Sequence, residues 1–66
     1  MKKAIIKVTF KDGSFGYYKS NECITSEKSW AKVFSKTYAE GLVEGINFGI
    51  KLYEDPMTEK AEIEEL

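Results

Sequence analysis

The sequence contains no histidine and no arginine, and it has one cysteine, Cys23, and one proline, Pro56. Without histidine the chain lacks the commonest general base and metal ligand, so no Ser-His or Cys-His nucleophile pair can form within it. A single cysteine excludes an internal disulfide framework and a multi-cysteine zinc site, and it is typical of a reducing compartment. We therefore expect a cytoplasmic, non-enzymatic protein with no metal and no cofactor.

Long apolar runs are also missing, although 42% of the 66 residues are hydrophobic. That fraction is too high for an intrinsically disordered chain, yet no run approaches the roughly 20 apolar residues of a membrane span. The first residues lead directly into a strand-like pattern, so we expect no signal peptide and no membrane partner. All ten basic residues are lysine. Arginine makes bidentate contacts with phosphate and guanine, so a chain without arginine is less suited to sequence-specific recognition of nucleic acid.

The charges divide unevenly along the chain. Residues 1–53 carry nine lysines and five acidic residues, whereas residues 54–66 carry one lysine and six acidic residues. We predict a single folded unit over 1–53, followed by an acidic tail or a short helix over 54–66 that begins at Asp55.

The first third of the chain predicts a β-hairpin. In residues 4–10 apolar side chains alternate, and Asp12-Gly13 favours a two-residue type I′ turn. In that register Phe10 lies opposite Phe15 and Val8 lies opposite Tyr17. The apolar residues of both strands then share one face.

The polar stretch of residues 19–28 predicts a loop, and a helix is expected next, over residues 27–40. Ser26 is its predicted N-cap, and its apolar stripe has three- and four-residue spacing. Gly41, Gly45 and Gly49 repeat every four residues, and the sequence lacks the patterns of a phosphate-binding loop or a dinucleotide fingerprint. We interpret Gly41 as the helix C-cap and Gly45 as a turn.

Beyond that turn, apolar residues alternate from Ile46 to Leu52, which predicts a strand over 46–53. The expected fold is α+β: a small two-layer β-β-α-β domain with a three-stranded sheet in the order 2-1-3 and the helix on one face. Pairing of the third strand in another molecule is the alternative.

This fold leaves the other face of the sheet uncovered, and that face is the candidate binding surface. Its predicted binding residues are Ile5, Lys7, Tyr18, Asn47, Gly49, Lys51 and Tyr53. Tyrosine is common at protein interfaces, and a chain this short has a marginal core, so we expect a protein partner or a second copy of the chain. The leading hypothesis is a small binding or inhibitor-type protein that covers a surface on a macromolecule. Small chains of this composition are common among phage and mobile-element accessory proteins, and we expect that class.

Two alternatives use other chemistry. The same face, with its tyrosines and lysines, suits single-stranded nucleic acid, because bases stack on aromatic rings while lysines bind the backbone. An oligomer that sequesters a nucleotide or another anion on glycine backbone amides is the third hypothesis.

Overall fold

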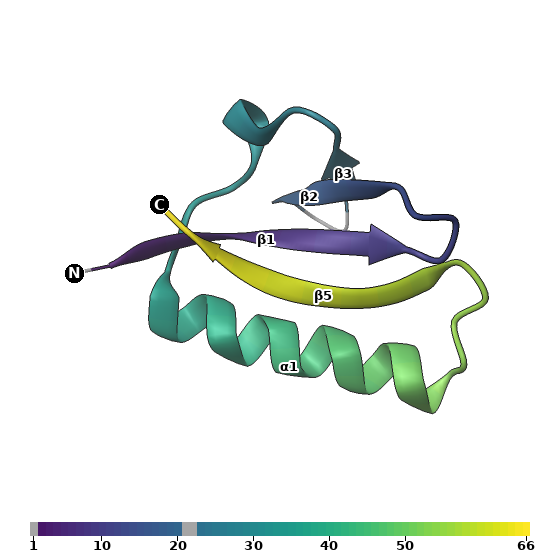
Figure 1. Cartoon of the computed structure of the whole chain (residues 1–66). Helices are drawn as coiled ribbons and strands as arrows, with labels where there is room; N and C mark the ends of the chain where they lie inside the picture. Colours follow the sequence, from purple (N-terminus) through teal and green to yellow (C-terminus); the bar gives the residue numbers. More distant parts are fainter. Residues whose placement is uncertain (1, 21–22) are drawn as a thin grey trace.

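The structure is a computed structural model that describes residues 2–20 and 23–66. In this part of the chain one long helix lies along a curled antiparallel sheet (Figure 1). The elements in chain order are β1 (Lys3–Phe10), β2 (Phe15–Ser20), β3 (Cys23–Thr25), the 3-10 helix η1 (Lys28–Trp30), β4 (Phe34–Ser35), α1 (Lys36–Leu52) and β5 (Thr58–Glu65). The predicted α+β class with one α-helix is therefore confirmed.

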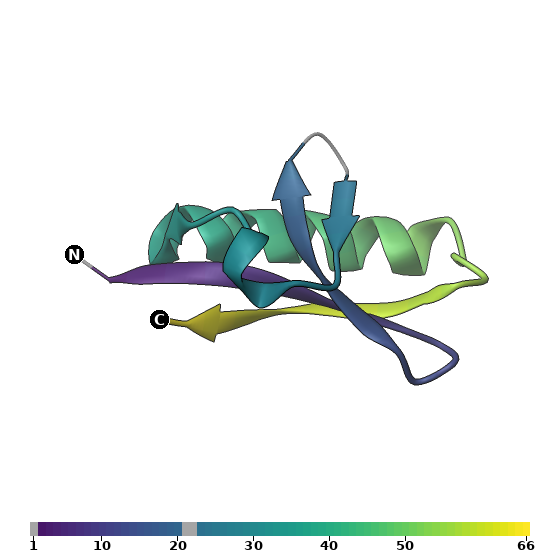
Figure 2. The same cartoon turned by 90° about the horizontal axis from the view of Figure 1, so that it is seen from above.

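Strand β1 is the centre of the sheet. Ala4 pairs with both Glu65 of β5 and Phe34 of β4, and Lys7 pairs with both β5 and β2, so β5 lies on one edge of β1 and β2 and β4 on the other. Strand β3 pairs with the far edge of β2, and every pairing is antiparallel. Figure 2 shows β2 and β3 running across the direction of β1 and β5, which is the curl of the sheet. The predicted strand order 2-1-3 is wrong for the third strand: the strand that pairs with the second edge of β1 is β5, not residues 46–53.

The helix is displaced from its predicted position. It spans Lys36–Leu52 rather than 27–40, so the strand predicted over 46–53 is wrong and the glycines at 41, 45 and 49 lie inside α1. Ser35 is the N-cap, and its Oγ accepts a hydrogen bond of 3.4 Å from the backbone N–H of Tyr38. The helix ends after Leu52, where the N–H of Tyr53 donates to the carbonyl of Gly49 and Glu54 takes a positive φ of 50°.

The physical reason for the error is that two periodicities overlap here. The side that α1 turns toward the sheet is built by Ala39, Leu42, Val43 and Ile46, at helical spacing. The apolar alternation from Ile46 to Leu52 places Phe48 on the far side of the helix, where it is 67% exposed. Each glycine in a helix interior costs about 1 kcal/mol relative to alanine. Burial of the apolar side outweighs that cost.

The segment predicted as a helix from residue 27 is extended apart from η1. The N–H of Lys36 donates to the carbonyl of Lys2, and β4 pairs with the start of β1. The Phe34 ring lies 5.8 Å from the ring of Tyr18 and 5.5 Å from that of Tyr38. These tertiary contacts hold Phe34 in a strand, so its helical spacing in the sequence has no structural role. The predicted loop between β2 and the helix contains β3, and residues 21–22 of it lie outside the described residues.

The hairpin exists, but its register differs from the prediction by one residue. Thr9 pairs with Phe15, and Lys7 with Tyr17. The N–H of Phe10 donates to the carbonyl of Ser14, so the loop has three residues, 11–13, and Gly13 takes the left-handed φ of 94° that such a loop needs at its last residue. Because side chains alternate between faces, this shift places Tyr18 on the helix side of the sheet and Tyr17 on the other side.

The acidic end of the chain is a strand, so the prediction of a tail or short helix is wrong for residues 58–65. Ala61 and Ile63 alternate with charged residues and face the helix, while the charged side chains remain outside or form ion pairs. Glu65 lies 3.0 Å from the Lys36 ammonium and 3.9 Å from that of Lys2, and Lys28 pairs with Glu64. The hydrogen bond and charge of Lys36 hold the pKa of Glu65 below its usual value, and Glu65 raises the pKa of Lys36 in return.

The core between sheet and helix is small. Its buried residues are Ala4, Ile6, Val8, Ala39 and Ala61. Ile5 and Tyr17 are also buried, at 1% and 7% exposure, on the opposite face of the sheet. Lys28 of η1 bonds to Glu64, which pairs with Ile5, so the η1 segment covers this part of the face.

Candidate apolar binding groove

An open apolar groove of about 690 Å³ lies between the β2–β3 hairpin, the second half of α1 and the turn that leads into β5. We call it the apolar groove. It is lined by Val8, Phe10, Tyr18, Ile24, Ile46, Gly49, Ile50, Tyr53, Asp55, Pro56, Met57 and Thr58. Asp55 is the one charged residue in this lining. The groove therefore suits apolar surface far better than a polar ligand.

The curl of the sheet and one glycine form the upper wall. Gly16 lies in β2 opposite Val8, and a Cβ at this position would collide with Cγ2 of Ile24 and lie 3.3 Å from the carbonyl oxygen of Thr25. The absence of a side chain thus lets β3 approach β2 closely. As a result Ile24 lies over the groove while remaining 42% exposed.

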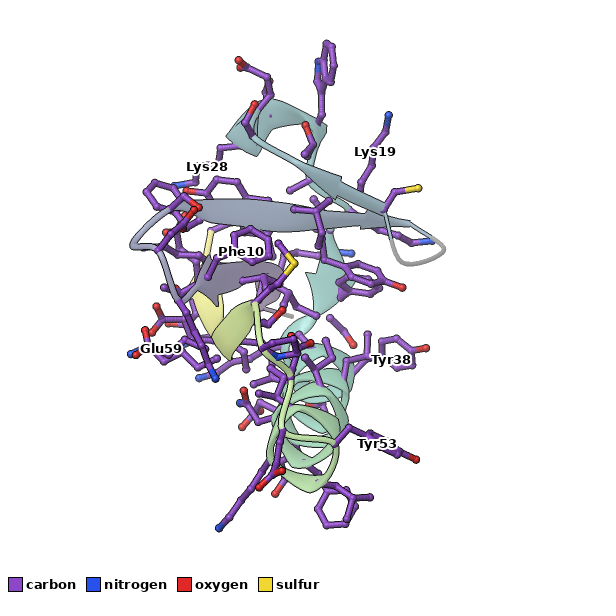
Figure 3. The ribbon with its side chains drawn as sticks, turned by 90° about the vertical axis from the view of Figure 1, so that its right-hand side faces the viewer. Phe10, Lys19, Lys28, Tyr38, Tyr53 and Glu59 are labelled. Atoms are coloured by element: carbon purple, nitrogen blue, oxygen red, sulfur yellow. The ribbon has the colours of Figure 1, made fainter. Side chains whose placement is uncertain are left out.

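The lower wall comes from the helix and the turn after it. Ile46 and Ile50 face inward, and Tyr53 stands at the rim with 80% of its surface exposed. Figure 3 shows Tyr38 and Tyr53 projecting from α1 on one side, whereas Lys28 and Glu59 lie on the other side of the molecule. Met57 is 72% exposed, so the groove is bordered by large apolar side chains that nothing in the described chain covers.

Asp55 organises the turn at the end of the groove. Its Oδ1 accepts hydrogen bonds of 2.8 Å from the N–H of Met57 and 3.0 Å from the N–H of Thr58. These bonds favour the carboxylate and lower the pKa of Asp55. The sequence indicated Asp55 as a helix cap, and the same capping chemistry instead closes the turn before β5. Asp55 therefore places a fixed negative charge at one end of the apolar groove.

The structure separates the seven predicted binding residues. Tyr18, Gly49 and Tyr53 come together in the groove, although the sequence placed them on the outer sheet face. Ile5 is buried, and Lys7 lies on the outer face with its ammonium 4.4 Å from the centre of the Phe15 ring.

The other two predicted residues lie on the helix. Lys51 is exposed. Asn47 forms two hydrogen bonds with the backbone of Ala61. The predicted face of tyrosines and lysines is not assembled, because Tyr18 lies on the helix side of the sheet and Tyr53 lies directly after α1, at its C-cap.

The other groove residues were not predicted as binding residues, and Ile24, Pro56 and Met57 are the exposed ones among them. All three lie in segments that were expected to be a loop or a tail. A signal was present, because Ile24 is the one large aliphatic residue in the polar stretch 19–28 and Met57 follows the turn-forming pair Asp55-Pro56. Isolated apolar residues in such stretches mark surface contacts only after the fold brings them together.

Neither a metal site nor a membrane span is found in the described part of the chain. No three His, Cys, Asp or Glu side chains within residues 2–20 and 23–66 are arranged to hold a metal ion. Over the same residues, no helix has both the length and the apolar character needed to cross a bilayer. The chain matches no protein-family model, no curated protein and no solved structure. The case for a function therefore depends on the groove.

Proposed function

We propose that this chain is a small non-enzymatic binding protein that covers an apolar segment of a protein partner with its apolar groove. One observation carries the proposal: Ile24, Tyr53 and Met57 border the groove and are 42%, 80% and 72% exposed. Contiguous apolar surface of this kind on a small protein is typical of an interaction site. Covering the segment would block its other contacts, which is how an inhibitor-type protein acts.

The lining favours a protein segment over a small molecule. Small-molecule sites combine apolar walls with several polar groups that fix the ligand's orientation. Here Asp55 is the one charged group, and one of its carboxylate oxygens already accepts two backbone N–H groups. The remaining negative charge favours a lysine or arginine beside the partner's apolar residues.

The two alternative functions have less support. Nucleic-acid binding on the outer sheet face required Tyr18 and Tyr53 on that face, and both line the groove instead. Anion sequestration required free glycine amides, but Gly41, Gly45 and Gly49 lie inside α1, where backbone amides bond within the helix.

The test is a selection of peptides from a displayed random library, followed by measurement of their affinity for variants of the protein. We expect the selected peptides to share apolar residues next to a basic residue. Met57→Glu and Ile24→Glu should weaken binding by at least about tenfold, because each buries a charge in the apolar contact. Leu66→Glu is the matched control, since Leu66 is 66% exposed outside the groove. Peptides that bind all three variants equally, or a library that yields no binder, would overturn the proposal.

A further inference from the structure

The side of α1 that faces away from the sheet carries a second uncovered apolar surface. Its residues follow the spacing three, four, three, four, and we call them the outer helix stripe: Tyr38, Gly41, Gly45, Phe48 and Leu52. The three large members are 59%, 67% and 58% exposed. This spacing is the a and d pattern of helices that pack against another helix.

No contact in the described part of the chain requires glycine at the three glycine positions of α1. A Cβ added at Gly41, Gly45 or Gly49 would meet no atom of the described chain within 4 Å. Glycine is nevertheless among the poorest helix formers, second only to proline. Alanine would serve the isolated chain better at all three positions. Glycine is useful there if another surface approaches the helix backbone closely.

A second copy of the same helix in antiparallel orientation matches this surface residue by residue. In the a-to-d register of an antiparallel pair, Phe48 lies over Gly45 of the second copy and Leu52 lies over its Gly41. Phe48 and Leu52 thus each meet a glycine, and the two-fold axis repeats both contacts.

The charges beside the stripe agree with the same register. Glu44 and Lys51 occupy the same flanking position one heptad apart, and in an antiparallel pair Lys51 lies opposite Glu44 of the second copy. The two-fold axis gives two such ion pairs. A parallel pair would instead set Phe48 against Phe48 and glycine against glycine, and Glu44 would lie beside Gly49.

We propose that α1 is a self-association surface and that two copies of the chain pack through their outer helix stripes in antiparallel orientation. The sheets then lie on the outside of a two-fold symmetric homodimer, and the glycines hold the large side chains of the other copy. The inference does not depend on the apolar groove, because Gly41, Gly45, Phe48 and Leu52 all lie outside its lining.

The experiment is sedimentation equilibrium of the full chain and its charge variants. The wild type should show a concentration-dependent monomer–dimer equilibrium with a dissociation constant on the order of micromolar, as expected for a small interface. Glu44→Lys and Lys51→Glu should each weaken the dimer by about tenfold, because each places like charges together twice. The double variant Glu44→Lys/Lys51→Glu should return to within about threefold of the wild type.

Two further variants complete the test. Glu40→Lys makes the same charge change on α1 outside the flanking position, and dimerisation should persist. Gly45→Leu fills the space for Phe48 and should abolish the dimer, while circular dichroism checks that the exposed substitution leaves the fold intact. A monomer at all concentrations up to about 1 mM would overturn the proposal. A dimer that tolerates Gly45→Leu, or that the double variant fails to restore, would also overturn it.

Discussion

The side-chain amide of Asn47 pairs with both backbone polar groups of Ala61. Nδ2 of Asn47 donates to the carbonyl of Ala61 at 2.9 Å, and the N–H of Ala61 donates to Oδ1 of Asn47 at 2.7 Å. Ala61 belongs to β5, and on its other edge β5 pairs with β1. The helix thereby supplies the hydrogen bonds that a further strand would make at this point. The Asn47 side chain therefore holds β5 against α1 and pairs two backbone polar groups on the free edge of β5.

Replacement of Asn47 should therefore destabilise the fold more than its partial exposure suggests. Asn47→Ala leaves the N–H and the carbonyl of Ala61 without their partners, and we expect the free energy of unfolding to fall by about 2 kcal/mol. Urea denaturation measures this change, and hydrogen exchange at the Ala61 amide should accelerate. Glu40→Ala on the exposed side of α1 is the control and should change stability by less than about 0.5 kcal/mol. Equal effects of the two substitutions would contradict this role of Asn47.

Gly16 should tolerate no side chain. In Gly16→Ala the new methyl collides with Ile24, so β3 must move away from β2 or the Ile24 side chain must rotate out of the groove. We expect a loss of about 1–3 kcal/mol of stability, together with weaker binding of groove-directed peptides. Thermal unfolding and peptide titration test the two effects. A variant with wild-type stability and affinity would show that the close approach of β3 is unimportant.

Alanine at the helix glycines should raise the stability of the chain, in contrast to alanine at Gly16. Gly41→Ala and Gly45→Ala meet no described atom and replace a poor helix former, so each should stabilise the isolated chain by about 1 kcal/mol. The measurement is chemical denaturation at a protein concentration below the dimer dissociation constant, where self-association does not contribute. Loss of stability at either position would mean that the surroundings of α1 in the monomer differ from those described.

Stability should fall in acid through Asp55 and Glu65. Both have a pKa lowered in the folded state, from ordinary values of 3.8 and 4.5, by hydrogen bonds from Met57 and Thr58 and by Lys36, respectively. Between the folded and the unfolded pKa values, the unfolded chain therefore binds more protons than the folded chain. The stabilisation is complete above the unfolded pKa values and is lost as the pH falls through the folded ones. The melting temperature measured from pH 6 to pH 2, at steps of about 0.5, should decline, and Asp55→Asn with Glu65→Gln should reduce the decline. An unchanged slope in the double variant would contradict this assignment.

The sequence predicted the hairpin pair β1 and β2 and the α+β class because these features depend on local signals. Alternating apolar residues and Asp12-Gly13 determine that two strands form, but not whether the loop holds two residues or three. A left-handed Gly13 is compatible with a two-residue and with a three-residue loop. The three-residue loop is selected because it places Tyr18 against the core on the helix side of the sheet. That single-residue difference moved every side chain of β2 to the other face.

The position of the helix could not be decided from local pattern alone. Residues 27–40 and 46–53 each carry a regular apolar spacing, and the glycines argued against a helix through 41–49. What decides the outcome is the partner of β1. Residues 58–65 supply Ala61 and Ile63 in alternation and take the place beside β1, which leaves 36–52 to cover the sheet as a helix. The candidate site changed with it, since Tyr18, Gly49 and Tyr53 meet only in this arrangement.

The most direct test of the binding role is nuclear magnetic resonance of the labelled protein titrated with a selected apolar peptide. If the peptide binds in the apolar groove, the largest chemical-shift changes should fall on Ile24, Ile50, Tyr53 and Met57. Resonances of Lys7 and Phe15 on the outer sheet face should change little. Changes concentrated on that outer face, or saturable binding that leaves Tyr53 and Met57 unperturbed, would contradict the account.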